Sequence, residues 1–181
     1  MAASPAAARQ RFEALVLPHL DAAFNLARWL LRDATAAEDA VQDAALRAFR
    51  YIDSLRGDDA RGWLLGIVRN TCFSALERGR GDREMVEFDE AGFDAALSEI
   101  GRATDDPTAA LEQRRTRTLI DAAIRALSPP LREVIVLREF EELEYAEIAR
   151  IASVPIGTVM SRLARARERM RAALSPLNLG R

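Results

Sequence analysis

The apolar residues of this chain recur at three- and four-residue intervals, and this spacing constrains the fold more than any other feature of the sequence. Apolar side chains spaced in this way lie on one face of an α-helix, whereas a half-buried strand requires alternation of apolar and polar residues. Alternation of β-branched or aromatic residues is nearly absent. We therefore predict an all-α protein.

The spacing and the turn residues together predict where the helices lie. Thr35 followed by Glu38 matches a capping box, which predicts that a helix begins there. The adjacent Pro129 and Pro130 predict a break between two other helices. The predicted helices cover residues 12–31, 35–52, 63–78, 107–127, 131–140, 145–151 and 156–174.

The charges are distributed unevenly along the chain, although the formal net charge is only −2. Residues 79–112 contain 3 Arg and 10 acidic residues together with several glycines, which is typical of a flexible linker. A short helical turn is expected within it at residues 93–100. We therefore predict an N-terminal helical domain (residues 1–78), an acidic flexible linker (79–112) and a C-terminal helical domain (113–181).

The C-terminal end of the chain is strongly basic, because residues 150–181 contain 7 Arg against 1 acidic residue. All 26 basic residues of the chain are Arg, and none is Lys. A biased codon usage is the simpler cause. Whatever the cause, the planar guanidinium binds phosphate and guanine with paired hydrogen bonds that an ammonium group lacks.

Residues 145–167 are the most informative stretch, because two helical patterns there flank a tight turn that ends at Pro155. The small Ala149 and the apolar Ile148, Val159 and Leu163 occupy the core positions of a helix-turn-helix. The second helix of such a motif enters the major groove of DNA. A charged run alone is more often a solvated helix face, but with this turn and apolar spacing we favour DNA binding.

Composition argues against several other classes of protein. A single Cys (Cys72) and a single His (His19) leave no intrachain disulfide, no multi-cysteine metal site and no histidine-based catalytic network. We expect both residues to lie in or beside the core. We expect no catalytic residue, no metal and no cofactor.

No apolar run reaches the roughly 18 residues that span a membrane, and no signal peptide is recognisable. The expected location is therefore cytoplasmic, without membrane insertion.

Four motifs in a fixed order resemble the extracytoplasmic-function (ECF) sigma factors, the compact two-domain branch of bacterial RNA polymerase sigma subunits. This chain resembles the family's polymerase-docking helix at Ala37-Glu-Asp-Ala-Val-Gln-Asp-Ala. It resembles the promoter-melting part at residues 51–64, followed by Ile67-Val-Arg-Asn70. The family's entry to its C-terminal domain resembles Leu127-Ser-Pro-Pro-Leu-Arg-Glu-Val. Its recognition helix resembles Pro155-Ile-Gly-Thr-Val-Met-Ser-Arg. The resemblance extends over about residues 12–174.

The resemblance implies that Asp39, Gln42 and Asp43 bind the clamp helices of the polymerase largest subunit, and that the C-terminal domain binds the flap of the second largest subunit. The spacing of Asp39, Gln42 and Asp43 places the three side chains on one face of a helix. The alternative is that acids near the helix N-terminus only offset the helix dipole, which fits Glu38 and Asp39 but fits Gln42 and Asp43 less well.

For the −10 element, the resemblance implies that the loop 54–60 and Asn70 form a pocket for an extruded base. Asn has both a donor and an acceptor with which to bind a base edge. Arg61 and Arg69 are expected to hold nearby phosphates. For Tyr51, a stacking role and a structural role are expected about equally, whereas Trp63 and Phe49 are expected in the core.

For the −35 element, the resemblance implies that Ser161, Arg162 and Arg165 contact the duplex, with Thr158 and Arg167 on phosphates. Met160 departs from relatives that carry Arg or Lys, and Ala164 is small where some relatives carry an aromatic residue. A thioether cannot donate to guanine; it packs against a base edge or a thymine methyl group.

The implied function is that of an alternative sigma factor, which binds core polymerase, directs it to promoters with particular −10 and −35 elements, and is held inactive by an anti-sigma factor. The acidic linker is equally well explained as a mimic of nucleic acid and as a plain spacer.

A competing hypothesis is a helix-turn-helix regulator of the response-regulator output type, which would need an N-terminal domain containing strands. A helical hydrolase is remote, because the common nucleophile and phosphate-binding motifs are missing.

Overall fold

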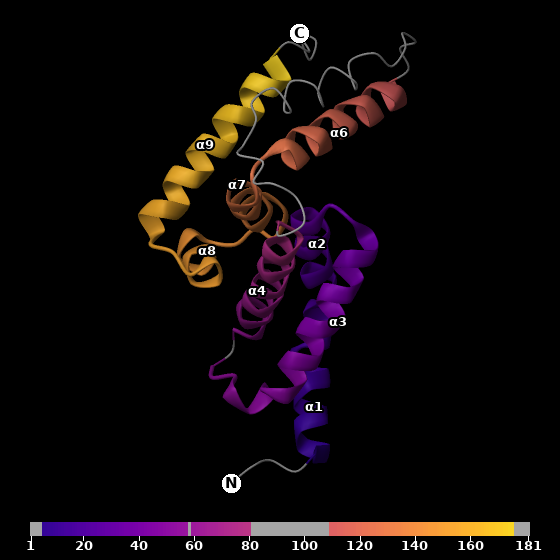
Figure 1. Ribbon diagram of the computed structural model, residues 1–181, viewed down its shortest axis with the longest axis vertical. Helices are drawn as coiled ribbons and strands as arrows, with labels where there is room; N and C mark the ends of the chain where they lie inside the picture. Colours follow the sequence, from indigo (N-terminus) through magenta and orange to yellow (C-terminus); the bar gives the residue numbers. More distant parts are fainter. Residues whose placement is uncertain (1–4, 58, 81–108, 176–181) are drawn as a thin grey trace.

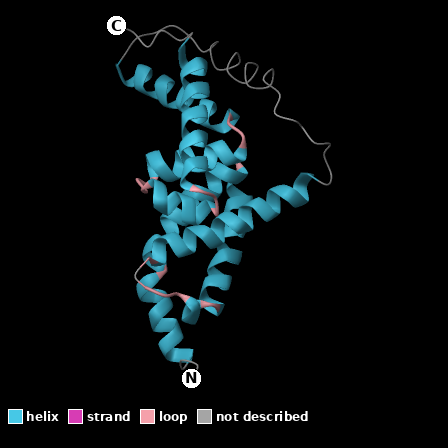
Figure 2. Ribbon diagram, turned by 90° about the vertical axis from the view of Figure 1, so that its left-hand side faces the viewer, coloured by secondary structure: helices cyan, strands magenta, loops and turns pink. Residues whose placement is uncertain are grey.

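The computed structural model describes residues 5–57, 59–80 and 109–175, and these residues form helices and loops without a strand (Figures 1 and 2). The prediction of an all-α protein is therefore confirmed for the described part of the chain. The N-terminal domain contains α1 (Pro5–Leu15), α2 (Leu20–Leu31), α3 (Ala34–Arg50) and α4 (Ala60–Arg80). The C-terminal domain contains α6 (Ala109–Ala126), α7 (Pro129–Ile135), α8 (Tyr145–Ala152) and α9 (Ile156–Leu174).

Three short turns connect these helices: the 3-10 turns η1 (Leu17–His19) and η2 (Ile52–Ser54), and the π-helical turn η3 (Val136–Phe140). The two ends of the expected linker, residues 79–112, are helical, because α4 continues to Arg80 and α6 begins at Ala109. The rest of that segment, including the expected turn at residues 93–100, lies outside the described residues.

The prediction of one continuous helix over residues 12–31 is wrong, because the chain breaks between α1 and α2. Pro18 lies in the break, inside η1. Proline has no backbone N–H, and its ring clashes with the carbonyl four residues earlier, so the helix of α1 cannot continue through it. Val16, fully buried just before η1, anchors the break in the core.

The predicted capping box at Thr35 and Glu38 is also wrong, because α3 begins one residue earlier. The N-cap is Asp33, whose Oδ1 accepts a hydrogen bond of 2.7 Å from the backbone N–H of Ala36. The buried face of α3 then consists of small residues alone: Ala37, Ala40, Ala44 and Ala48. These side chains allow α2 and α4 to approach α3 closely, and both helices pack against it.

A single cluster of buried apolar side chains extends through both domains. In the ribbon view α4 lies between α3 and α8, and α7 lies beside α2 (Figure 1). Cys72 on α4 is fully buried within this cluster, and burial raises the pKa of its thiol to about 12. The expectation that Cys72 is a core residue is confirmed.

One buried charge, the guanidinium of Arg132 on α7, joins the helices at the domain boundary. It donates to the carbonyls of Trp29 and Leu30 at the end of α2, at 3.0 and 3.1 Å. It also donates to the carbonyls of Ile124, Arg125 and Leu127 at the end of α6. The carbonyls of a helix C-terminus lack partners within the helix and carry its partial negative charge, so a cation there satisfies both needs.

Replacing Arg132 should destabilise the whole chain. We expect Arg132→Met to lower the free energy of unfolding by roughly 3 kcal/mol or more, because five carbonyls lose the hydrogen bonds that this buried guanidinium donates. Urea denaturation of the full chain, followed by circular dichroism, measures the change. The matched control is Arg50→Met at an exposed position of α3, which should stay within about 0.5 kcal/mol of the wild type. An Arg132→Met chain as stable as the control would contradict this role.

Candidate polymerase and nucleic-acid interfaces

The helix-turn-helix consists of α8, a short turn and α9, as the sequence predicted. Ser153 has φ 54° and ψ 44°, and this left-handed conformation ends α8. The N–H of Val154 then donates to the carbonyl of Ala149, and Pro155 stands before the first residue of α9. Ile148 on α8 is buried, as are Val159 and Leu163 on α9. The small side chain of Ala149 lets the two helices approach closely.

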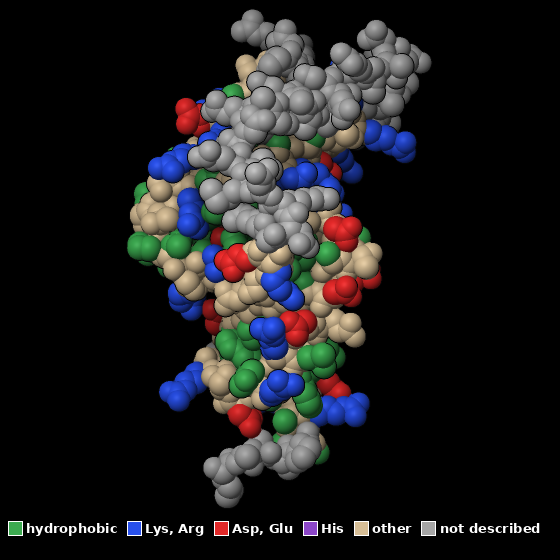
Figure 3. Space-filling view, in the orientation of Figure 1, with side chains coloured by type: hydrophobic (Ala, Val, Ile, Leu, Met, Phe, Trp, Pro, Cys, Tyr) green, Lys and Arg blue, Asp and Glu red, His purple; other side chains and the backbone are tan. Residues whose placement is uncertain are grey.

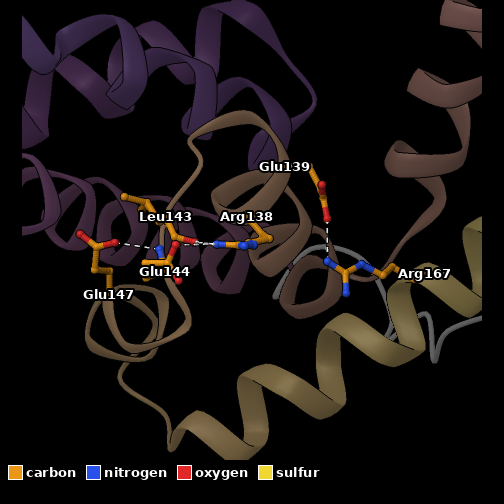
Figure 4. Close-up of polar contacts among 6 residues, drawn as sticks. All are labelled: Arg138, Glu139, Leu143, Glu144, Glu147 and Arg167. Atoms are coloured by element: carbon orange, nitrogen blue, oxygen red, sulfur yellow. Dashed lines mark hydrogen bonds and ion pairs between the residues drawn. The ribbon is translucent and has the colours of Figure 1, made fainter.

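Polar contacts fix the orientation of this motif (Figure 4). Glu144 and Glu147 form a capping box at the start of α8, in which the N–H of Glu144 donates to Oε2 of Glu147 at 2.7 Å. Arg138 of η3 donates to the carbonyl of Leu143 at 2.8 Å. The end of the loop before α8 is therefore held both to η3 and to the first turn of α8.

The five residues of α9 expected to bind the −35 element differ in their surroundings. Arg165 is exposed, and Thr158 is half-buried. Ser161 is exposed, and its hydroxyl donates to the carbonyl of Thr158 at 3.0 Å. The guanidinium of Arg167 lies 2.8 Å from the Glu139 carboxylate, and this hydrogen bond raises the pKa of Arg167 (Figure 4). Arg162 points inward and lies 3.8 Å from Oε2 of Glu133.

A cavity of about 380 Å³ lies between the N-terminal part of α4 and the C-terminal end of α8. Asn70 is exposed at its edge, and Trp63 on the same helix is half-buried in its wall. Asn70 and three residues of the expected loop 54–60 therefore line one cavity, but α8 forms its opposite wall. The residues around it are Leu55, Arg56, Asp59, Gly62, Trp63, Gly66, Ile67, Asn70, Arg150, Ile151 and Ser153.

Asp59, which lines this cavity, caps α4. Its Oδ1 accepts a hydrogen bond of 2.8 Å from the N–H of Gly62. A Cβ atom on residue 62 would lie only 2.6 Å from the same carboxylate, so any larger residue there would displace Asp59 from this capping position. The carboxylate of Asp59 also lies 3.1 Å from the guanidinium of Arg150 on α8. One side chain thus caps α4 and links it to the helix-turn-helix.

Arg61 and Arg69, the two arginines expected on −10 phosphates, are paired with carboxylates of the C-terminal domain. Arg61 lies 2.6 Å from Oε2 of Glu141, whose other oxygen accepts from Asn25 at 2.6 Å. Arg69 donates from Nε to Oε1 of Glu133 at 2.7 Å. Carboxylate and phosphate both accept paired hydrogen bonds from a guanidinium. A phosphate that approaches either arginine would therefore compete with the carboxylate for the same guanidinium.

Glu133 is the most unusual acid of the described chain, because its side chain is fully buried. Burial raises its pKa, although Arg69 and Arg162 both act to lower it. Oε2 of Glu133 and Nη1 of Arg162 are both buried and have no hydrogen-bond partner, since 3.8 Å is an ion-pair distance only. The recognition helix α9 and α4 therefore contact the same buried carboxylate.

The expected polymerase-binding residues lie on the outer face of α3. Asp39 and Gln42 are exposed, and Asp43 is half-buried. The carboxylate of Asp43 lies 2.9 Å from Arg47 one turn later, which offsets part of its charge. Asp39 therefore presents the carboxylate most accessible to a basic partner.

Several residues of these surfaces were expected elsewhere, were left open, or were not singled out from their sequence pattern. Phe49 was expected in the core but is 43 % exposed, where it contacts Phe12 edge to face. Trp63 is only half-buried, and Tyr51 is exposed. Glu133 and Glu141 were not singled out. The signal for Glu133 was a charged pair, with Arg132, inside the otherwise apolar run 131–137, which predicts that the charges are buried with partners.

No group of three or more potential metal ligands lies within the part of the chain that the structure describes. Among the same residues, no helix has the length and apolar character needed to cross a membrane.

Two sigma-factor regions match separate parts of the chain. The model of Sigma-70 region 2 matches residues 15–81, and that of Sigma-70, region 4 matches residues 117–170. The RNA polymerase sigma-H factor of Pseudomonas aeruginosa is 35 % identical over 175 residues, which cover 93 % of this chain and 89 % of the relative. The ECF RNA polymerase sigma-E factor of Escherichia coli K12 is 37 % identical over 145 residues, covering 77 % of this chain and 74 % of the relative.

Solved structures show a similar architecture. The sigma factor RpoE of Bartonella quintana, solved in complex with the anti-sigma factor NepR, superposes with a TM-score of 0.67 and 28 % identity, covering 91 % of this chain and 96 % of that one. CnrH, solved in complex with the cytosolic domain of CnrY, superposes with a TM-score of 0.63 and 22 % identity, covering 97 % of this chain and 99 % of that one. At this identity the similarity supports the fold alone.

A response-regulator output module would match in the helix-turn-helix domain only, whereas the N-terminal domain matches as well, so that alternative is not favoured. With two sigma regions in the expected order and a relative 35 % identical over nearly its whole length, the chain belongs to the ECF sigma factors, alternative sigma subunits that direct transcription by RNA polymerase.

Proposed function

We propose that the chain binds core RNA polymerase through α3, captures an extruded base of the −10 element beside Asn70, and reads the −35 duplex with α9. The observation that carries this proposal is the helix-turn-helix, whose second helix presents exposed Arg165 from a motif fixed by buried contacts. Such a helix binds the major groove with its N-terminal part. The chain itself is then a specificity factor, and the polymerase supplies the chemistry.

Polymerase binding is assigned to the exposed face of α3 around Asp39, Gln42 and Asp43. These side chains lie at spacings of one, three and four residues and share a helix face that the core does not use. Carboxylates exposed on a rigid helix suit a basic groove on a partner, where charge complementarity sets orientation and association rate. The flap of the second largest subunit is the proposed partner of the C-terminal domain.

Reading the −10 element requires a different use of the cavity at Asn70. Because α8 forms one wall of this cavity, an extruded base and its strand compete with α8 for the space in front of α4. The phosphates also compete with Glu133 and Glu141 for Arg69 and Arg61. We therefore expect the two domains to separate as the promoter is bound.

We also propose that an anti-sigma factor controls the chain. Support comes from the similar RpoE of Bartonella quintana, which was solved with the anti-sigma factor NepR. A protein that covered α3 and α9 in the described arrangement would block both polymerase and promoter binding.

Transcription in vitro tests the proposed function directly. Adding the purified chain to core polymerase on a fragmented genomic template should produce start sites that core polymerase alone does not use. Mapping of the RNA 5′ ends should place one common −10 and −35 pair upstream of them. Absence of new start sites would contradict the proposal.

Asp39→Arg should weaken binding to core polymerase by about tenfold or more, because the variant places a positive charge against a basic surface. Fluorescence anisotropy of the labelled full chain against core polymerase measures the affinity. The control is Asp121→Arg on the exposed face of α6, which should bind as the wild type does. Equal affinities for the two variants would exclude this face of α3 from the contact.

Glu141→Gln should raise the affinity of the free chain for single-stranded −10 DNA roughly two- to fivefold, because it removes the charge that holds Arg61 across the domain boundary. The probe is an oligonucleotide with the non-template −10 sequence of a promoter mapped as above. Glu142→Gln, the exposed neighbour, is the matched control and should leave the affinity unchanged. A Glu141→Gln chain that binds no more tightly than this control would show that the ion pair does not limit DNA binding.

A further inference from the structure

Two large apolar side chains are exposed on the first two turns of α9. Ile156 is 47 % exposed and Met160 is 54 % exposed, although both belong to a helix rich in arginine. They are four residues apart and so share one side of the helix, and the exposed Ala164 follows one turn later. Apolar side chains are visible at the left edge of Figure 3, where α9 begins in Figure 1.

These side chains do not contribute to the core of the domain. The buried stripe of α9 consists of Val159, Leu163 and Ala166, on a different side of the helix. The neighbouring polar groups are engaged within the domain, since Ser161 donates to a backbone carbonyl and Arg162 faces Glu133. The first two turns of α9 therefore offer a mainly apolar surface, and Arg165 stands beyond it.

We infer that Ile156 and Met160 read the 5-methyl groups of thymines in the −35 element. This inference rests on the proposed function, in which the N-terminal part of α9 enters the major groove. The thymine methyl group is the apolar feature of a major groove otherwise lined by donors and acceptors. Neither side chain has a donor for guanine. Over a G·C pair they would displace water without replacing its hydrogen bonds, which disfavours that pair.

The charge of the surroundings indicates DNA, and not an apolar protein surface, as the occupant. Residues 150–181 carry 7 Arg and 1 acidic residue, which suits the phosphates on either side of a groove. Four residues advance about 6 Å along a helix, and successive nucleotides of one strand are about 3.4 Å apart. The two side chains thus span about two base steps, and the preferred sequence should contain thymines about two positions apart.

Substitution of thymine by deoxyuridine tests this inference, because it removes the methyl group and leaves every hydrogen-bonding atom in place. Holoenzyme assembled from core polymerase and the full chain is first used to select duplexes from a library randomised at the −35 element. Each thymine of the selected sequence is then replaced singly. We expect about a fourfold loss of affinity at one or two positions, the effect of one buried methyl group.

Ile156→Ala and Met160→Ala identify the reader of each methyl group. Each variant should bind thymine and deoxyuridine equally at its own position while retaining the loss at the other. Both substitutions are at exposed helical positions, so the fold should be kept, as circular dichroism can verify. Arg165→Ala is the control, because it should weaken binding to the thymine and deoxyuridine duplexes by the same factor.

The outcomes separate this inference from the proposed function. A selected −35 sequence in which no thymine depends on its methyl group, or which contains no thymine, overturns the inference alone. The same holds if the Ile156→Ala and Met160→Ala chains retain the wild-type methyl effect. Failure to select any sequence overturns the proposed promoter reading itself.

Discussion

The arrangement of the two domains depends on the buried guanidinium of Arg132. None of the described carboxylates pairs with it; five backbone carbonyls, at the ends of α2 and α6, accept its hydrogen bonds. Burial lowers its pKa to about 10, so the group remains charged at neutral pH. A cation held between the negative ends of two helices stabilises both ends at once, and it fixes α7 between the domains.

The position of α7 decides what the neighbouring acids contact. Glu133 follows Arg132 directly and reaches Arg69 on α4 and Arg162 on α9, while Glu141, after η3, reaches Arg61 and Asn25. With Arg167, which pairs with Glu139 of η3, four of the arginines proposed to bind promoter DNA are paired with carboxylates in this arrangement. Since a guanidinium binds carboxylate and phosphate with the same geometry, these pairs and the DNA contacts are alternative uses of the same side chains.

Most of the secondary structure could be predicted because it depends on neighbours in the sequence. The bounds of α9 were predicted as the structure has them, and those of α8 to within one residue. The errors were also local: Pro18 breaks a helix whose apolar spacing continues through it, and Asp33 competes successfully with Thr35 as the cap. Phe49 has core spacing yet is exposed, because the alanine face of α3 is the one that packs against α2 and α4.

The sequence by itself determined the all-α class, the helix-turn-helix and the positions of the polymerase- and DNA-binding candidates, because spacing and turn residues act over about a dozen positions. Only the tertiary structure decided which candidates are accessible. The contacts of Arg69 with Glu133, Arg61 with Glu141 and Arg132 with Trp29 join residues 64, 80 and 103 positions apart. Such pairs depend on how α7 packs against α2 and α4, and no local pattern specifies that packing.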